Sequence, residues 1–300
     1  MHHTTLSLRH ALLALAVMAI WGSNFVVARL GLEQFPPFLF AGLRFTLAAL
    51  PLAVLLPRPN VSWRNLAAYG LLIGTGQFGL LFLALNGHIS PGLASLVIQV
   101  QVFITIFLAM LRNGERLRGF QIIACLLAIT GILVIAAHVN GHTTPLGLAL
   151  VLMAAGCWAS GNIVAREGRP DNFLAYVAWS SLFSAPPLLG LSLLTEGPAT
   201  MAHAISHATL GGWAALIWQA VGNSWFGYAC WGMLLARYPS ATITPMALLV
   251  PVFGMGSAVL WLHEPMPAWK LGAALLVIVG LAVSVFYPRL QAGMARRRPL

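Results

Sequence analysis

The chain has 300 residues, of which 59% are hydrophobic and only 7% are charged. A soluble globular domain carries about 25% charged residues, so this composition excludes a soluble domain, and its hydrophobicity excludes intrinsic disorder. Long apolar runs recur along the whole chain, which also excludes a soluble enzyme with a single membrane anchor. The composition therefore predicts a polytopic membrane protein.

A helix that crosses the hydrocarbon core of a bilayer needs about 20 mostly apolar residues. Ten runs of this kind follow one another, separated by charges, turn residues and His-rich stretches. In chain order they are 11–32, 38–56, 66–87, 91–111, 119–137, 146–165, 173–194, 210–235, 241–262 and 269–287. The first run is too long for a signal peptide and holds no clear cleavage site. We expect an all-α protein with ten transmembrane helices in the lipid bilayer.

The positive charges predict the orientation of these helices. The net charge is +10, from 16 cations against six acids. Only Arg29 and Lys270 fall on one side of the predicted spans, and Arg44 lies within the second span. The other 13 cations share the opposite side: Arg9, Arg58, Arg64, Arg112, Arg116, Arg118, Arg166, Arg169, Arg237, Arg289 and Arg296 to Arg298. The positive-inside rule places that side, with both termini, in the cytoplasm. The basic charge is thus explained by topology, and we expect no nucleic acid partner.

The sequence contains an internal duplication. Six residues of the run that begins at Trp21 recur in the run that begins at Trp158, at a constant offset of 137. Further pairs follow at slightly larger offsets: Phe78-Gly79 with Phe226-Gly227, Glu115 with Glu264, and Gly131 with Gly280. We divide the chain into repeats at 1–142 and 143–300. Each repeat holds five spans, an odd number, so the repeats must face opposite ways across the membrane. Inverted repeats are typical of secondary transporters, whose binding site lies between them near the midplane.

Polar side chains inside the spans are the candidate substrate-binding residues, because such groups face the bundle interior or an aqueous cavity. Gln99 and Gln101 point roughly 160° apart on a helix, so we expect one to line a cavity and the other to bond a neighbouring helix. Interhelical hydrogen bonding is the alternative function for each of these groups. The candidates are Asn24, Gln77, Gln99, Gln101, Asn162, Trp158, Tyr228 and Arg44.

Arg44 is the only cation that lies clearly inside a predicted span, away from its ends. It can hold the carboxylate of a substrate, or it can extend to the outer interface or cap helix carbonyls, and we favour the structural role. Prolines predict two interrupted helices, the seventh span at Pro186-Pro187 and the ninth at Pro245 and Pro251. Interrupted helices expose backbone groups to a solute, whereas packing kinks have no such consequence.

No cofactor or metal is expected from the sequence. There is no Walker A loop and no HExxH motif, and the GxGxxG match at 74–79 lies inside a span, where it indicates close helix packing. His203 and His207 have helix-like ligand spacing but no acid nearby, so we interpret them as part of a solvated loop. All six acids lie in loops or at span ends. Without a titrating group at membrane depth, we expect facilitated diffusion or solute exchange instead of proton coupling.

Ten spans in two inverted halves, with Trp21-Gly22-Ser23-Asn24-Phe25 in the first span and Gly114-Glu115-Arg116-Leu117 after the fourth, resemble the EamA-type drug/metabolite transporter superfamily. The stretch from Pro91 through Gln99 and Gln101 is similar to the members that export O-acetylserine and cysteine. The resemblance implies a secondary transporter in a bacterial inner membrane that exports small amino acids or their metabolites by alternating access.

Three alternatives remain open at this point. Other members of the same superfamily export aromatic amino acids or drugs. A channel-like facilitator conducts without alternating access, and a saturable counterflow separates it from a carrier. A membrane enzyme needs a catalytic carboxylate, histidine or nucleophile at membrane depth, and the spans contain no convincing set.

Overall fold

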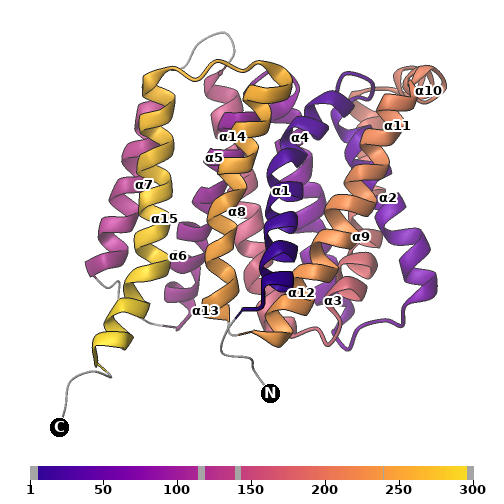
Figure 1. Cartoon of the computed structure of the whole chain (residues 1–300). Coiled ribbons are helices and arrows are strands. Elements are labelled where there is room, and N and C mark those ends of the chain that lie inside the picture. The colour runs from indigo at the N-terminus through magenta and orange to yellow at the C-terminus, as the bar shows by residue number, and fades with distance from the viewer. Residues whose placement is uncertain (1–5, 114–118, 139–142, 239, 296–300) are drawn as a thin grey trace.

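The computed structural model describes residues 6–113, 119–138, 143–238 and 240–295, which form a bundle of long helices that run side by side (Figure 1). The first repeat contains α1 (Leu8–Gly31), α2 (Pro37–Leu55), α3 (Trp63–Gly70), η1 (Leu71–Gly79), α4 (Leu80–Leu85), α5 (Pro91–Val97), η2 (Ile98–Val100), α6 (Gln101–Asn113) and α7 (Gly119–Ala137). The second contains α8 (Pro145–Gly168), α9 (Phe173–Thr195), α10 (Pro198–His207), α11 (Leu210–Ile217), η3 (Trp218–Phe226), α12 (Gly227–Arg237), α13 (Ser240–Ile243), η4 (Thr244–Leu248), α14 (Leu249–Leu262) and α15 (Ala268–Ala295).

These elements agree closely with the ten predicted spans. Nine helices of the described chain are long and apolar enough to cross a membrane. The tenth span is the continuous helical stretch α11–η3–α12, whose mean hydropathy is lowered by Gln219, Asn223 and four tryptophans. The fifth span has the predicted bounds, and α15 is longer than its predicted span because the helix continues to Ala295. The all-α fold with ten membrane spans is confirmed.

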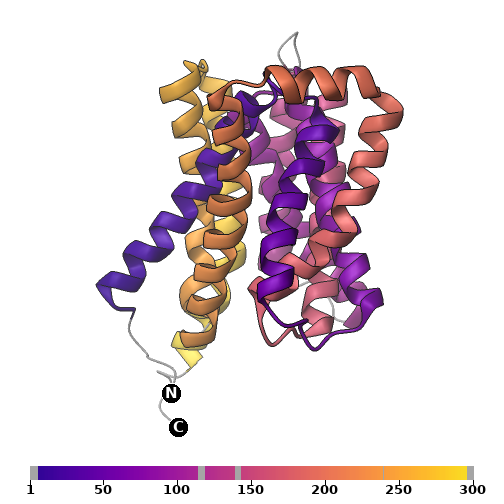
Figure 2. The same ribbon diagram turned by 90° about the vertical axis from the view of Figure 1, so that its right-hand side faces the viewer.

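The segment before the eighth span differs from the prediction. The residues that we interpreted as a solvated loop form the helix α10, which carries His203 and His207 on one face. Gly197 has a φ of +87°, which turns the chain after α9, and Pro198 occupies the first turn of α10, where a missing N–H costs nothing. Figure 2 shows α10 lying across one end of the bundle instead of along it.

Four segments of the spans depart from α-helical geometry, and they occur in pairs. The third and eighth spans each contain a nine-residue π-helix, η1 and η3, and the fourth and ninth spans each contain a short 3₁₀ segment, η2 and η4. Pro186-Pro187 does not interrupt α9, so the expected break there is wrong. Pro245 does begin an irregular segment, since it lies in the first turn of η4.

The two repeats pack through equivalent helices. The second and seventh spans, α2 and α9, lie against each other, as do the fifth and tenth spans, α7 and α15. At the α7–α15 contact, a Cβ on Gly131 would lie 2.7 Å from Val277, and a Cβ on Gly280 would lie 2.7 Å from the carbonyl of Ala124. Two glycines related by the repeat therefore allow the close approach of the same helix pair from both sides.

The ends of the bundle also match the predicted inversion. Arg29, at the end of α1, lines the same cavity as Glu264 and Lys270, which follow α14. Arg166 lies near the end of α8, the sixth span, at the opposite end of the bundle. The described chain begins and finishes at this second end, where α1 starts and α15 stops (Figure 1).

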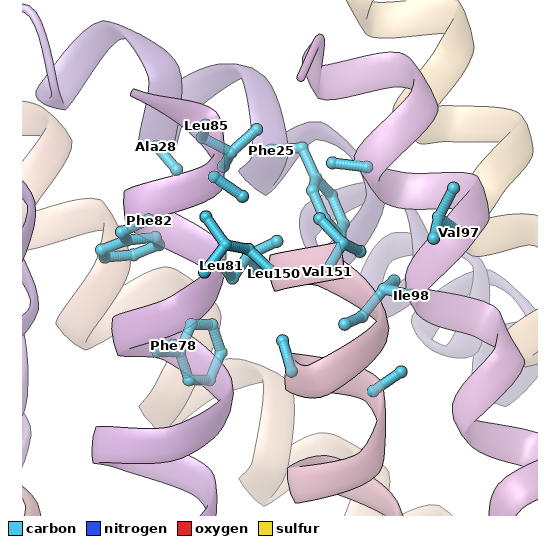
Figure 3. Close-up of a cluster of buried hydrophobic side chains, with 14 of the residues drawn as sticks. Phe25, Ala28, Phe78, Leu81, Phe82, Leu85, Val97, Ile98, Leu150 and Val151 are labelled. Carbon is cyan, nitrogen blue, oxygen red and sulfur yellow. The ribbon is translucent and has the colours of Figure 1, made fainter. Parts of the chain in front are cut away.

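The apolar core forms where spans of both repeats converge. Phe25 of α1, Leu81 of α4 and Ile98 of η2 come from the first repeat, and Val151 of α8 comes from the second. Figure 3 shows these side chains pointing toward one another between the helices. The interface between the repeats is thus largely apolar, and polar side chains enter it at a few defined places.

Candidate functional site

A small cavity of about 70 Å³ lies between the repeats and is the candidate binding site, here called the central cavity. Both repeats contribute to its wall. Its lining residues are Trp21, Asn24, Phe25, Gln77, Phe78, Leu81, Ile98, Trp158, Asn223, Tyr228 and Val250. Trp21 and Trp158 occupy equivalent positions of the two repeats. The inverted symmetry thus places one tryptophan from each repeat against the same space.

Three amides supply the hydrogen-bonding groups of the central cavity. Asn24, Gln77 and Asn223 are buried, and among the described residues Asn24 Oδ1 and Gln77 Oε1 have no hydrogen-bond partner. An unpaired buried polar group costs about 1–3 kcal/mol, and such groups are rare in folded proteins. Amide side chains both donate and accept, so this site matches a small polar solute with an ammonium or hydroxyl group.

Two further predicted residues, Trp158 and Tyr228, form aromatic wall. Tyr228 packs against Trp21 with ring centroids 5.5 Å apart, and the indole Nε1 of Trp21 donates a hydrogen bond to the carbonyl of Asn223 (3.2 Å). Four of the eight predicted site residues, Asn24, Gln77, Trp158 and Tyr228, therefore meet at one cavity. Trp21 and Asn223 also line the cavity but are not among the predicted site residues. The sequence does contain a signal for Trp21, because it is the repeat equivalent of the predicted residue Trp158.

The other amides bond across the repeat interface and are not among the residues that line the central cavity. Asn162 Nδ2 donates to Gln101 Oε1 (3.0 Å), which joins α8 to α6. Gln99 Nε2 donates to the carbonyl of Ala247 (3.4 Å), which joins η2 to η4. These contacts are hydrogen bonds between helices, which is the alternative that the sequence left open for these amides.

Arg44 lies on α2 with its side chain fully buried. It does not extend to the interface, and among the described residues it donates to no helix carbonyl, so neither structural function expected for it is observed. Its Nη2 donates to the hydroxyl of Ser224 (3.4 Å), and its guanidinium lies 3.7 Å from the centroid of the Phe78 ring. The guanidinium faces a second, very small cavity of about 10 Å³, which we call the arginine cavity.

A larger cavity of about 510 Å³ opens at the end of the bundle where α1 finishes, and a buried ion pair lies in its wall. Glu264 Oε1 accepts from Lys270 Nζ (2.8 Å) and from the hydroxyl of Ser90, and Glu264 Oε2 accepts from the backbone N–H of Gly92 (3.0 Å). The sequence placed Glu264 correctly at a span end but gave no sign of its burial. Among the described residues, no three His, Cys, Asp or Glu side chains are grouped to hold a metal.

The fold and the central cavity define a class of protein: a polytopic membrane transporter built from two inverted five-helix repeats. The EamA-like transporter family matches this chain twice, over residues 8–137 and 145–286, and the chain belongs to that family.

The chain is similar along nearly its whole length to two bacterial proteins that are named as probable amino-acid metabolite efflux pumps. It is 41% identical to a probable amino-acid metabolite efflux pump of Escherichia coli (strain K12), over 94% of this chain and 96% of that protein. The corresponding pump of Salmonella typhimurium is 39% identical over 94% and 96%. A solved crystal structure with 19% identity superposes with a TM-score of 0.65, over 94% of this chain and 98% of the other, and it supports the fold alone.

Proposed function

We propose that this transporter exports small amino acids or their metabolites, of the cysteine and O-acetylserine kind, by alternating access. The observation that carries the proposal is the central cavity, which lies between the repeats and combines unpaired amide oxygens with two repeat-related tryptophans. Inverted-repeat carriers bind their solute at this place. The names of the two curated relatives, both amino-acid metabolite efflux pumps, support the same class of solute.

The lining explains how such a solute binds. The amides of Asn24, Gln77 and Asn223 bond ammonium and hydroxyl groups, and the aromatic rings of Trp21 and Trp158 cover the apolar part of the solute. In the low dielectric of this site, a hydrogen bond is stronger than in water. The bonds between the repeats, Gln99 with Ala247 and Gln101 with Asn162, are then contacts that a change between inward-facing and outward-facing forms has to rearrange.

The proposed location is the inner membrane of a bacterium, with both termini in the cytoplasm. The arginine distribution supports this orientation, and the described chain starts and finishes at one end of the bundle (Figure 1). In this orientation the 510 Å³ cavity with Glu264 and Lys270 opens to the outside.

The test is efflux of a panel of labelled amino acids, including cysteine and O-acetylserine, from cells that overproduce the protein. We expect efflux of at least one small polar amino acid, and we expect Asn24→Ala and Gln77→Ala each to reduce it without lowering the amount of protein in the membrane. Asn60→Ala, in an exposed loop, is the matched control. Normal efflux by both cavity variants, or efflux of none of the panel, contradicts the proposal.

A further inference from the structure

Arg44 differs from every other buried charge that the structure describes. The second buried cation, Lys270, is paired with Glu264 at 2.8 Å. Arg44 has no acid beside it: its Nε and Nη1 have no hydrogen-bond partner among the described residues, and its Nη2 has only the hydroxyl of Ser224. A buried charge is costly unless it is paired and hydrogen-bonded. A buried guanidinium without a counter-ion in the protein is suited to bind an anion that comes from outside the protein, such as a solute.

The surroundings of Arg44 leave the correct atoms free for such an anion. The guanidinium carbon of Arg44 lies over the Phe78 ring, 3.7 Å from its centroid, and 5.0 Å from the centroid of the Phe45 ring. Stacking uses the face of the guanidinium, whereas a carboxylate binds in its plane, at the edge that carries the N–H groups. The unpaired Nε and Nη1 lie in this plane on two different edges, and each edge is shared with Nη2, which has a second N–H besides the one that bonds Ser224. A carboxylate can therefore bind at either edge while Phe78 stays over the guanidinium.

The walls of the arginine cavity supply no competing charge. Apart from Arg44, its polar lining consists of hydroxyls from tyrosines and serines, and no acidic residue of the described chain lines it. Ser181 Oγ donates to the carbonyl of Val177 (2.7 Å), and Ser184 Oγ donates to the carbonyl of Gly70 (2.8 Å). At the repeat offset of 137, Ser181 is the residue equivalent to Arg44. The site is therefore asymmetric, with a cation from one repeat facing a hydroxyl from the other.

Arg44 lines a cavity that shares two wall residues with the central cavity. Phe78 and Tyr228 line both cavities. Phe78 belongs to the π-helix η1, and Tyr228 lies in the first turn of α12, directly after the π-helix η3. Single π-helical segments are frequent at functional sites. A change of conformation in η1 or η3 would move Phe78 or Tyr228, the residues that the two cavities share.

We propose that Arg44 is a specificity-determining residue that binds the carboxylate of the exported solute, and that Phe78 and Tyr228 form the partition that opens to admit it. This inference rests on the proposed function and names the feature of the solute that the site selects. The amides of Asn24 and Gln77 receive the ammonium end, and the guanidinium receives the carboxylate end. A solute with both ends is preferred over its analogue without the carboxylate.

The experiment uses the purified full-length protein in liposomes and compares L-cysteine with cysteamine, which is cysteine without its carboxylate. Counterflow of labelled cysteine is measured first, and unlabelled cysteine, cysteamine and 3-mercaptopropionate then compete with it. We expect 3-mercaptopropionate, which keeps the carboxylate and lacks the amine, to compete with wild-type protein. Competition by cysteamine equal to that by cysteine overturns the inference without any variant, even though cysteine is still transported.

Variants then assign the selectivity to Arg44. We expect Arg44→Gln to weaken the apparent affinity for cysteine by about 10- to 100-fold, the factor that a buried charge-assisted hydrogen bond contributes, and to leave that for cysteamine within about twofold. Arg44→Lys keeps the charge but loses the two-pronged geometry, so an intermediate loss is expected. Arg64→Gln, at an exposed position, is the control. An equal loss for cysteine and cysteamine in Arg44→Gln, or no loss for either, refutes the assignment.

A binding readout accompanies the transport assay. Cysteine is expected to raise the unfolding temperature of the wild-type protein and of Arg64→Gln in detergent, but not that of Arg44→Gln. If Arg44→Gln cannot be purified as a monodisperse protein, Arg44→Lys and the wild-type competition series carry the test. Failure of the proposed function is recognised separately, because wild-type protein then shows no counterflow of cysteine or of any other amino acid in the efflux panel.

Discussion

The buried ion pair between Glu264 and Lys270 allows a quantitative prediction about stability. Glu264 Oε1 lies 2.8 Å from Lys270 Nζ, and the two side chains are only 7% and 5% exposed. The carboxylate also accepts the hydroxyl of Ser90 and the N–H of Gly92, which belong to the first repeat. Glu264→Gln keeps an acceptor for one of these bonds but leaves the Lys270 charge buried without its counter-ion.

The expected loss follows from these contacts. Removing one partner of a buried pair costs about 3–5 kcal/mol, and Lys270 retains one bond to the carbonyl of Pro265 (2.9 Å). We therefore expect Glu264→Gln to lower the free energy of unfolding by about 3 kcal/mol, at the lower end of that range. Glu264→Gln combined with Lys270→Met removes the uncompensated charge and should recover more than half of the loss.

The assay is reversible unfolding by SDS in mixed micelles, followed by tryptophan fluorescence. Glu33→Gln, an exposed acid at the same end of the bundle, is the control and should change stability by less than about 0.5 kcal/mol. The reasoning is refuted if Glu264→Gln is as stable as Glu33→Gln, or if the double variant is less stable than Glu264→Gln alone.

Three more predictions test the topology, the packing and the energetics. Reporter fusions after Pro170 and after Ala208 should report the cytoplasm and the outside respectively, because the residues at these positions follow helices that finish at opposite ends; identical reports would contradict the inverted orientation. Gly131→Leu should destabilise the protein by about 1–3 kcal/mol through overpacking, since its Cβ would lie 2.7 Å from Val277, whereas Gly272→Leu, with open space around its Cβ, should be tolerated. In liposomes with equal solute on both sides, an imposed pH gradient should drive no sustained accumulation of a solute whose own charge is constant over that range; uphill accumulation would reveal a coupling group at membrane depth.

The sequence predicted the membrane spans and the repeat well because both are patterns of residues along the sequence and do not depend on contacts between distant helices. A 20-residue apolar run is a local signal, and every predicted span overlaps a helix that the structure describes. The repeat was visible because Trp21 and Trp158, and later Gly131 and Gly280, recur at near-constant offsets. Gly131 and Gly280 then meet the partner helix at the same α7–α15 contact, which explains why both positions carry the smallest residue.

The features that the sequence did not reveal depend on contacts between distant helices. The π-helices η1 and η3 contain no proline, whereas Pro186-Pro187 lies within an unbroken α9. The direction of a glutamine in the fourth span depends on how its helix is rotated, and one residue changes that direction by about 100°. Gln99 therefore reaches Ala247 of the ninth span, a contact that no local pattern predicts. The helix α10 was missed because its start, Gly197-Pro198, also fits an ordinary turn.

The alternating access that we propose would give the irregular segments a common explanation. In an inverted-repeat carrier the two halves exchange their conformations, so an element that bends in one half needs a counterpart in the other. The π-helices η1 and η3 meet this requirement, and so do the 3₁₀ segments η2 and η4, which are joined by the bond from Gln99 to Ala247. The groups that would select a solute need no such pairing, since the solute is itself asymmetric. Arg44 and its equivalent Ser181 line one cavity, which fits this difference. Under the proposed mechanism the paired helical segments would change conformation, and this asymmetric pair of side chains would select the solute.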